Sequence, residues 1–253
     1  MSAKKVLIVL SSRDSITVTS SDGSTRQQAT GFFLKELAQP LLRLLAAGYT
    51  PVFANADGSK PALDPLSDNA LWFLSFTEKA REKELLEKMA VERNFAQPKR
   101  FAELRDQQLQ EFAGVFVPGG HAPMEDLGVD TELGRIMGWF HEKRLPTAVI
   151  CHGPIALLSA HSPADPDSFP YKGYKVTCYS NKEEITNEFM WGGKLPRCED
   201  ALKEVGCDVE TPMVPLMPKV VVDRELVSGN GPTSADQLGE KFVEMLEKGV
   251  GNV

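Results

Sequence analysis

The stretch that decides the fold covers residues 145–160 and reads LPTAVICHGPIALLSA. Within it, Thr147–Ile150 is a short, mainly apolar run of the kind that forms a buried parallel strand. Residues 155–158 favour a helix, and Pro154 suits the first turn of that helix. A strand that enters a helix through so tight a turn leaves its central side chain, here Cys151, above the sheet. The stretch therefore predicts an α/β fold with a cysteine nucleophile elbow.

The residues alone leave two interpretations of Cys151 open. Gly153 fills the position at which a glycine permits the close turn of a nucleophile elbow. A thiol at a helix N-terminus faces unpaired N–H groups and the positive end of the helix dipole, so we expect a lowered pKa and a reactive thiol. The alternative is a buried structural cysteine, which is the usual state of a free thiol. The tight turn favours the reactive interpretation.

Composition and charge are those of an ordinary globular protein. Of 253 residues, 42% are hydrophobic and 25% are charged, which suits one α/β domain with a large core. A net charge of −7 and a pI of about 5.3 argue against nucleic acid or an anionic membrane as main partner. Residues 1–10 hold too few apolar residues for a secretory or membrane-spanning segment. Four cysteines without C-x-x-C spacing predict a reduced, cytoplasmic location.

Strand and helix patterns alternate along the chain. The predicted strands are 5–10, 50–54, 114–117, 147–150, 174–178, 219–222 and 226–227. The predicted helices are 31–47, one or two within 71–96, 101–112, 130–144, one that a loop enters within 181–189, 198–205 and 234–246. Residues 11–30 are expected to be a loop with a turn at Asp22-Gly23-Ser24. The alternation predicts a mostly parallel sheet with helices on both faces, in a single domain over 1–253 with a helical insertion at about 67–100.

Two further sites have more than one interpretation. Glu36 lies off the apolar stripe of helix 31–47, and helix statistics alone would make it a solvated surface carboxylate. Its neighbours Phe32 and Phe33 weaken that interpretation. Gly119 and Gly120 follow a predicted strand, where backbone N–H groups can bind an oxyanion, although a Gly-Gly pair can also be a simple turn.

Missing motifs narrow the chemistry. The chain has no G-x-G-x-x-G after its first strand and no P-loop, so neither motif supports a nucleotide cofactor. The four histidines (His121, His141, His152 and His161) are too scattered to predict a zinc site. We therefore expect thiol chemistry that uses no cofactor and no metal.

Four motifs together resemble the ThiJ/PfpI superfamily, which is related to class I glutamine amidotransferases. They are Gly119-Gly120-His121, residues 148–154, the pattern T-G-x-F-x-x-E-x-x-x-P over 30–40, and V-x-G-x-x-P-x-S-A over 227–235. The likeness runs from Val6 to about Leu246. It implies a flavodoxin-like three-layer α/β sandwich. The branch that the chain resembles most is the stress-induced one, with glutathione-independent glyoxalase (glyoxalase III) and chaperone activity and a possible homodimer.

The resemblance also implies roles for individual residues. Cys151 matches the nucleophile and His152 the histidine beside it, while Glu36 matches the acid that points at the thiolate. Glu184 matches the glutamate that pairs with the histidine, although the adjacent Glu183 is an alternative. The family's oxyanion donors fall at the backbone N–H groups of Gly120 and His152, with Gly119 beside them. Ala122 stands where relatives often have glycine, and segment 71–96 is enlarged, so the mouth of the pocket is expected to differ.

These residues suit a small dicarbonyl substrate such as methylglyoxal. A thiolate adds readily to the aldehyde, backbone donors stabilise the alkoxide, and an imidazole can move a proton through an enediol to a thioester. Water then releases lactate, so the expected enzyme is a lyase of the glyoxalase III (D-lactate dehydratase) type that also acts on glyoxal. One alternative is a stress-related holdase chaperone or an oxidation sensor built on Cys151. Another is a thiol amidase or peptidase, which would need an open cleft for a peptide.

Overall fold

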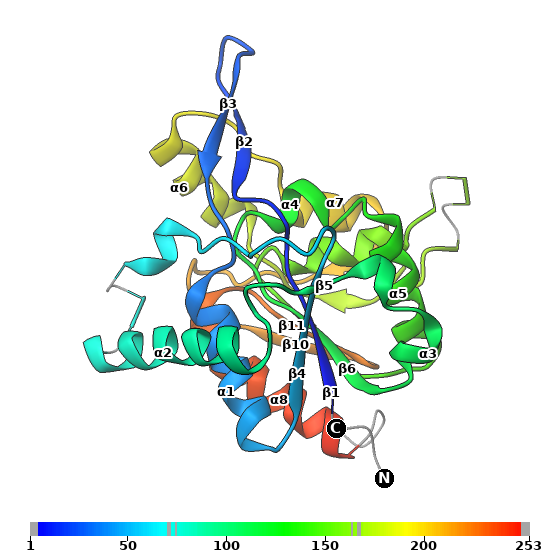
Figure 1. Ribbon diagram of the computed structural model, residues 1–253. Helices are drawn as coiled ribbons and strands as arrows, with labels where there is room; N and C mark the ends of the chain where they lie inside the picture. Colours follow the sequence, from blue (N-terminus) through cyan, green and yellow to red (C-terminus); the bar gives the residue numbers. More distant parts are fainter. Residues whose placement is uncertain (1–4, 70–71, 74, 163, 166–167, 249–253) are drawn as a thin grey trace.

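A seven-stranded sheet crosses the middle of the computed structural model, in the order β10-β11-β7-β6-β1-β4-β5 (Figure 1). Its strands are β1 (Lys5–Val9), β4 (Thr50–Asn55), β5 (Lys99–Arg100), β6 (Phe112–Val117), β7 (Thr147–Ile150), β10 (Val220–Asp223) and β11 (Leu226–Gly229). Every pair is parallel except β10 with β11. The predicted α/β fold is therefore confirmed.

The structure describes residues 5–69, 72–73, 75–162, 164–165 and 168–248. Residues 1–4 of the N-terminal run and residue 71, the predicted start of a helix, lie outside the described residues. The charged segment that was expected to be an insertion contains α2 (Phe76–Glu92). Within the described residues, no helix is both long and apolar enough to cross a membrane.

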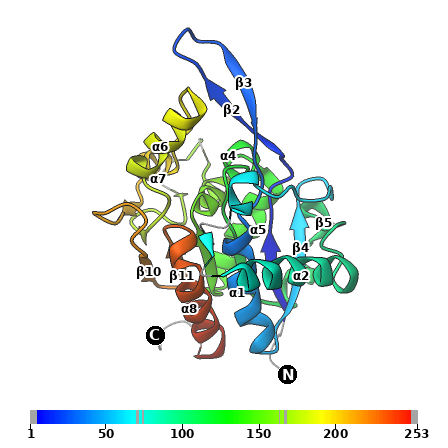
Figure 2. The same ribbon diagram turned by 90° about the vertical axis from the view of Figure 1, so that its left-hand side faces the viewer.

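Helices cover both faces of the sheet because successive residues of each strand point to opposite sides. On β1, Val6 and Ile8 join the core beneath α1 (Leu34–Ala46), α2 and α8 (Ala235–Lys248). Leu7 and Val9 join the other core, beneath α5 (Thr131–Glu142), α7 (Cys198–Glu204) and the 3₁₀ helix η4 (Gly153–Ala160). Figure 2 shows α1, α2 and α8 together on one side of the sheet. These are the layers of the predicted three-layer sandwich.

Several short elements connect these layers. They are η1 (Pro65–Asp68), η3 (Phe101–Glu103), α3 (Asp106–Leu109), α4 (Pro123–Asp126), α6 (Asn181–Trp191), η6 (Pro232–Ser234), β8 (Lys175–Val176) and β9 (Asp208–Val209). The predicted helix 101–112 was wrong, because Phe112 is buried as the first residue of β6 and only two short helical turns precede it. The predicted strand 174–178 is reduced to β8, which pairs with β9 outside the main sheet.

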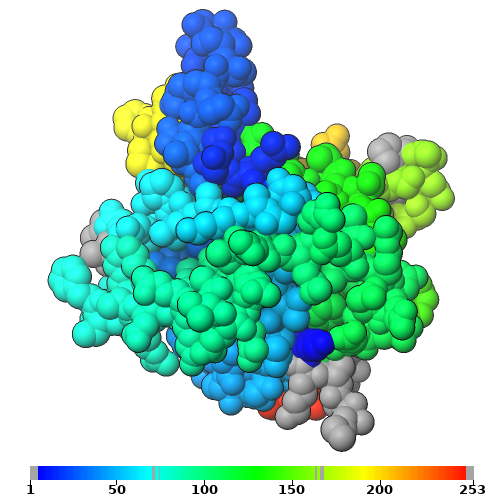
Figure 3. All heavy atoms as spheres, in the orientation of Figure 1, coloured from blue at the N-terminus to red at the C-terminus, as the bar shows by residue number. Residues whose placement is uncertain are grey.

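A β-hairpin replaces the loop that was expected over residues 11–30. Strands β2 (Ser15–Thr19) and β3 (Thr25–Ala29) pair in antiparallel register around the predicted turn, where Gly23 has a φ of 83°. The hairpin forms because Ile16 and Val18 alternate with polar residues and bury themselves against Trp191 and other apolar side chains. Figure 3 shows it projecting from the body of the molecule, with α6 beside it.

Candidate active site

Cys151 lies in a tight turn at the carboxyl edge of the sheet, directly after β7. Its φ is 61°, a left-handed conformation that is costly for a residue with a side chain and is held by the surroundings. Its backbone N–H donates to the carbonyl of Gly229 and its carbonyl accepts from the N–H of Tyr179, both at 2.9 Å. A Cβ on Gly153 would lie 2.4 Å from the carbonyl oxygen of Val117. The neighbouring strands thus fix the elbow that the sequence predicts.

A small cavity of about 40 Å³ adjoins the thiol, and we call it the thiol cavity. It forms where β6 and β7 end, the edge at which α/β sheets commonly bind ligands. Its walls are Phe33, Glu36, Asp64, Leu66, Trp72, Gly120, His121, Cys151, His152, Tyr179, Asn187 and Pro232. Its size suits a few atoms of a small molecule and leaves no room for a peptide chain.

Glu36 is fully buried beside the thiol, so the interpretation as a solvated surface carboxylate is wrong. Neither carboxyl oxygen has a hydrogen-bond partner of normal geometry among the described residues. Burial raises the pKa of Glu36 to about 8, although the Cys151 thiol acts in the opposite direction. A Cβ on Gly119 would lie 2.5 Å both from the Cβ of Cys151 and from Oε2 of Glu36. The glycine therefore lets a protonated Glu36 approach the sulfur.

The lowered pKa that was expected for Cys151 is contradicted by its surroundings. Only 4% of the residue is exposed, and burial followed by the charge of Glu36 raises the pKa of the thiol well above its ordinary value. The backbone N–H of Gly120 acts in the lowering direction. The helix after the elbow is a 3₁₀ helix, and burial outweighs any effect of its dipole. The resting group is thus a thiol that needs a base to become a nucleophile.

His152 and Glu184 lie where a base and its partner are expected. Nδ1 of His152 lies 3.3 Å from the Cys151 sulfur, and its Nε2 lies 2.7 Å from Oε2 of Glu184. Burial lowers the pKa of His152, so a neutral imidazole faces the thiol at neutral pH. Burial would raise the pKa of Glu184, but two neighbouring imidazoles outweigh it and lower that pKa.

The structure also gives Glu183 and Glu184 different hydrogen-bond partners. Glu183 accepts hydrogen bonds from the backbone N–H and hydroxyl of Ser180, and so completes a capping box at the start of α6. Its other oxygen accepts from the N–H of Leu216. Glu184 is thus the residue that the fold brings to His152, while its catalytic role stays a prediction.

His121 is a member of the site that the sequence did not assign. It follows β6, and its Nε2 lies 2.9 Å from Oε1 of Glu184. Burial would lower the pKa of His121, but Asp64 and Glu184 raise it to about 9. Its place in Gly-Gly-His, directly after a strand that neighbours β7, was the signal that could have identified it.

The four histidines are too scattered in the sequence to predict a metal site, but His121 and His152 lie together here. His121, His152 and Glu184 each bring one potential ligand atom within 4.8 Å of the others. Two imidazole nitrogens and a carboxylate are a donor set that Zn²⁺ accepts. Both oxygens of Glu184 already bind the imidazoles, so an ion would have to displace these contacts.

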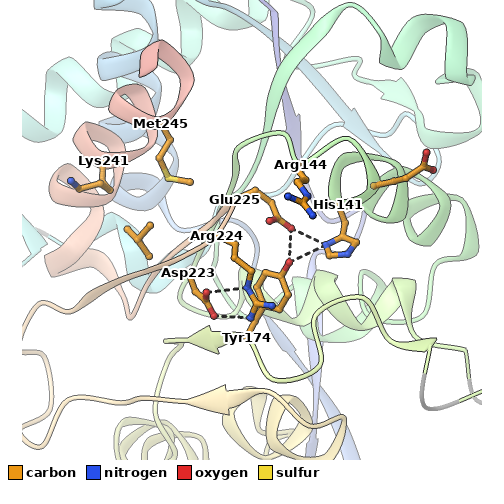
Figure 4. Close-up of a pocket in the computed structure, with 10 residues that line it drawn as sticks. His141, Arg144, Tyr174, Asp223, Arg224, Glu225, Lys241 and Met245 are labelled. Atoms are coloured by element: carbon orange, nitrogen blue, oxygen red, sulfur yellow. Dashed lines mark hydrogen bonds and ion pairs between the residues drawn. The ribbon is translucent and has the colours of Figure 1, made fainter. Parts of the chain in front are cut away.

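A larger cavity, of about 1000 Å³, lies at the opposite edge of the sheet, where β7 and β11 begin (Figure 4). There Oε1 of Glu225 lies 2.8 Å from Nδ1 of His141 and accepts the hydroxyl of Tyr174 at 2.9 Å. The Arg224 guanidinium stacks on the Tyr174 ring at 3.3 Å. None of the described residues that line this cavity is a cysteine, whereas Cys151 lines the thiol cavity.

Comparisons with known proteins give a family and several relatives. The family model described as DJ-1/PfpI family matches residues 34–245. The protein/nucleic acid deglycase HchA of Staphylococcus aureus (strain MRSA252) is 26% identical over 235 residues, which cover 86% of this chain and 73% of that protein. HchA of Pseudomonas aeruginosa (strain UCBPP-PA14) is 25% identical over 253 residues, covering 96% of this chain and 81% of that protein.

Solved structures share the fold as well. The crystal structure of glyoxalase III from Candida albicans aligns with a TM-score of 0.75 and 23% sequence identity. The alignment covers 96% of this chain and 98% of that chain. At this identity the likeness establishes the architecture alone.

Proposed function

Because the chain belongs to the DJ-1/PfpI family, we propose that it is a glutathione-independent glyoxalase that converts methylglyoxal, and also glyoxal, to a 2-hydroxy acid. The observation that carries the proposal is that Glu36, Cys151 and His152 line one small cavity, while Glu184 contacts His152 from behind. This set supplies a nucleophile, a base, an orienting carboxylate and a protonated acid, as covalent catalysis requires.

The first step is addition of sulfur to the aldehyde. Nδ1 of His152 takes the thiol proton while the Cys151 sulfur forms a bond with the aldehyde carbon. The carbonyl electron pair moves to oxygen, which then receives that proton and gives a hemithioacetal. The N–H of Gly120 acts on the sulfur in the resting site, and in the proposed step it donates to the developing oxyanion.

The second step exchanges oxidation levels between neighbouring carbons. The neutral His152 removes the hydrogen of the hemithioacetal carbon as a proton, and an enediol forms with the adjacent ketone carbon. Return of a proton to that carbon gives a thioester of lactate, which water hydrolyses to the acid and the free thiol. One carbon is oxidised and its neighbour reduced, so the reaction consumes only water.

The size of the thiol cavity favours a glyoxalase over a thiol peptidase. Methylglyoxal has five heavy atoms and suits a cavity of about 40 Å³, whereas a peptidase needs a large open cleft beside its nucleophile. Trp72 and Tyr179 are among the walls that narrow the space next to Cys151. The geometry thus favours the small substrate.

A second candidate activity is deglycation of early adducts between methylglyoxal and side chains. An apolar groove of about 440 Å³ shares four wall residues with the thiol cavity and favours this candidate. The groove is lined by Leu66, Asn69, Trp72, Tyr179, Glu183, Thr186, Asn187, Met190, Pro215 and Leu216. It could hold the carrier of an adduct while the adduct's carbonyl carbon reaches Cys151. The relatives named deglycases make this candidate worth testing.

The test mixes chelator-treated protein with methylglyoxal in the absence of any free thiol and follows substrate loss and lactate formation. We expect lactate from the parent and none above background from Cys151→Ala. Equal lactate from both proteins would refute the covalent mechanism. For deglycation, the hemithioacetal of N-acetylcysteine is supplied with a methylglyoxal scavenger. Lactate formed only without the scavenger indicates that free methylglyoxal is the substrate.

A further inference from the structure

A second imidazole faces the same cavity as His152 and is joined to it through one carboxylate. The rings of His121 and His152 lie 4.2 Å apart, centroid to centroid. Glu184 binds Nε2 of His121 with one oxygen and Nε2 of His152 with the other, at 2.9 and 2.7 Å. The Nδ1 atom of each ring is therefore not bound by Glu184 and can contact another group. On His152 that nitrogen faces the sulfur.

On His121, Nδ1 faces Asp64 across a gap. Nδ1 lies 4.0 Å from Oδ2 of Asp64, which is too long for a direct hydrogen bond. Asp64 is fully buried and held in place by the Thr30 hydroxyl and the Leu66 N–H, each at 2.8 Å. Since His121 and Asp64 both line the thiol cavity, a substrate oxygen beside this pair, off the line that joins the two atoms, can accept a hydrogen bond from Nδ1. As a hydroxyl it can also donate one to Asp64.

The surroundings of His121 and His152 shift the pKa values of the two rings in opposite directions. The titratable groups facing His121 are Asp64, Glu184, His152, Tyr179 and Glu36. Asp64 and Glu184 outweigh burial and raise the pKa of His121 to about 9, whereas burial and the neighbouring His121 lower the pKa of His152. At neutral pH one ring is a proton donor and the other a proton acceptor.

We propose that His121 is the general acid of this site, a catalytic residue that protonates the substrate's ketone oxygen while His152 removes the proton from the adjacent carbon. The inference rests on the proposed glyoxalase function and deepens it. The proposal also explains the position of Asp64, because a buried carboxyl group beside Nδ1 of His121 keeps a proton on that nitrogen and orients the imidazole ring.

The proton balance closes over one turnover. In the forward half, His152 gains the proton of the hemithioacetal carbon, the electron pair forms the C=C bond, and the ketone oxygen takes the Nδ1 proton of His121. In the return half, His152 gives its proton to the former ketone carbon, and the other enediol hydroxyl returns a proton to His121. Both rings regain their starting states, and Glu184 neighbours the single positive charge throughout.

The test compares His121→Gln with the parent over pH 5 to 10, with methylglyoxal as substrate and lactate as product. We expect kcat to fall by ~10²-fold or more, as for loss of a general acid. The alkaline fall of the parent's kcat/KM near pH 9 should disappear. Alkylation of Cys151 by iodoacetamide should continue at a rate close to that of the parent, which shows an intact elbow. His121→Asn replaces it if the first variant does not fold.

A matched control is His141→Gln, which breaks a pair between a half-buried histidine and a buried glutamate at the opposite edge of the sheet (Figure 4). It should keep the parent's kcat and its pH profile. A parent-like kcat in His121→Gln would overturn the proposal and leave the glyoxalase function standing. A limb near pH 8 that persists in His121→Gln belongs to Glu36, whereas persistence of the limb near pH 9 also overturns the proposal. No lactate from the parent itself would reject the glyoxalase function, and this proposal with it.

Discussion

The carboxyl group of Glu36 makes folding depend on pH. Its pKa is about 8 in the fold, against 4.5 for an ordinary glutamate. The folded chain therefore keeps a proton that the unfolded chain releases above pH 4.5. Stability is lost through this group as the pH rises from about 4.5 to about 8.

Glu36→Gln should remove this loss, because the amide has a similar volume and no proton to release. We expect the stability advantage of the variant over the parent to widen by roughly 3 kcal/mol between pH 5 and pH 8. Urea unfolding of both proteins at the two pH values measures it. A constant difference would mean that Glu36 ionises at its ordinary pH.

Glu184 and Glu183 form a natural matched pair for substitution. Glu184→Gln leaves the two imidazoles without their shared carboxylate, so we expect kcat to fall by ~10²-fold while the protein still folds. Glu183→Gln disturbs the Ser180 capping box and should cost about 1 kcal/mol of stability with kcat nearly unchanged. Turnover and urea midpoints of both variants give the answer. The opposite pattern would make Glu183 the partner of His152.

At the scale of elements, the elbow depends on how closely β6 passes the turn after β7. A Cβ on Gly153 would lie 2.4 Å from the carbonyl oxygen of Val117. Because a Cβ and a carbonyl oxygen are both fixed to the backbone, either the turn at Gly153 or strand β6 would have to move. Gly153→Ala should therefore destabilise the fold by about 1–3 kcal/mol, as overpacking does, and displace Cys151.

Gly138→Ala in α5 is the matched control, because a Cβ there meets nothing within 4 Å. It should stabilise the protein by about 0.5–1 kcal/mol through helix propensity and leave turnover unchanged. Thermal unfolding and lactate formation are measured on both variants. Equal stability of Gly153→Ala and the parent would show that the elbow tolerates a wider turn.

At the scale of the whole molecule, exposed apolar side chains gather in two segments. Phe189 is 88% exposed on α6, and Met213 is 90% exposed in the loop before β10. Met190 and Leu216, from the same two segments, line the apolar groove beside the thiol cavity. A holdase chaperone would need an exposed apolar surface of this kind. The chaperone and oxidation-sensor alternatives stay predictions, as do the expected homodimer and cytoplasmic location.

If the chain suppresses aggregation of other proteins, this surface should do so without the thiol. We expect Cys151→Ala to retain any suppression of thermal aggregation of a client enzyme. Phe189→Ser combined with Met213→Ser should lose most of it and keep glyoxalase turnover. Light scattering of the client with each variant measures the effect. Loss of suppression in Cys151→Ala would instead support an oxidation sensor.

The sequence by itself determined the parallel sheet, the elbow at Cys151 and the adjacency of His152. These depend on runs of four to eight neighbouring residues, where side-chain period and turn chemistry act locally. The same local reasoning missed the β2–β3 hairpin. Its alternation at Ile16 and Val18 is short, and the hairpin is fixed by contact with Trp191, far along the chain.

Only the tertiary structure decided the protonation states and the partners of the site. Glu184 lies 32 positions from His152 and 63 from His121. The two histidines meet because β6 and β7 are parallel neighbours that end at one edge, and α6 brings Glu184 to them. Whether Cys151 rests as a thiol or a thiolate depends on the balance between burial and nearby charges. That balance is a property of the enclosed cavity, because desolvation arises only when distant segments exclude water together.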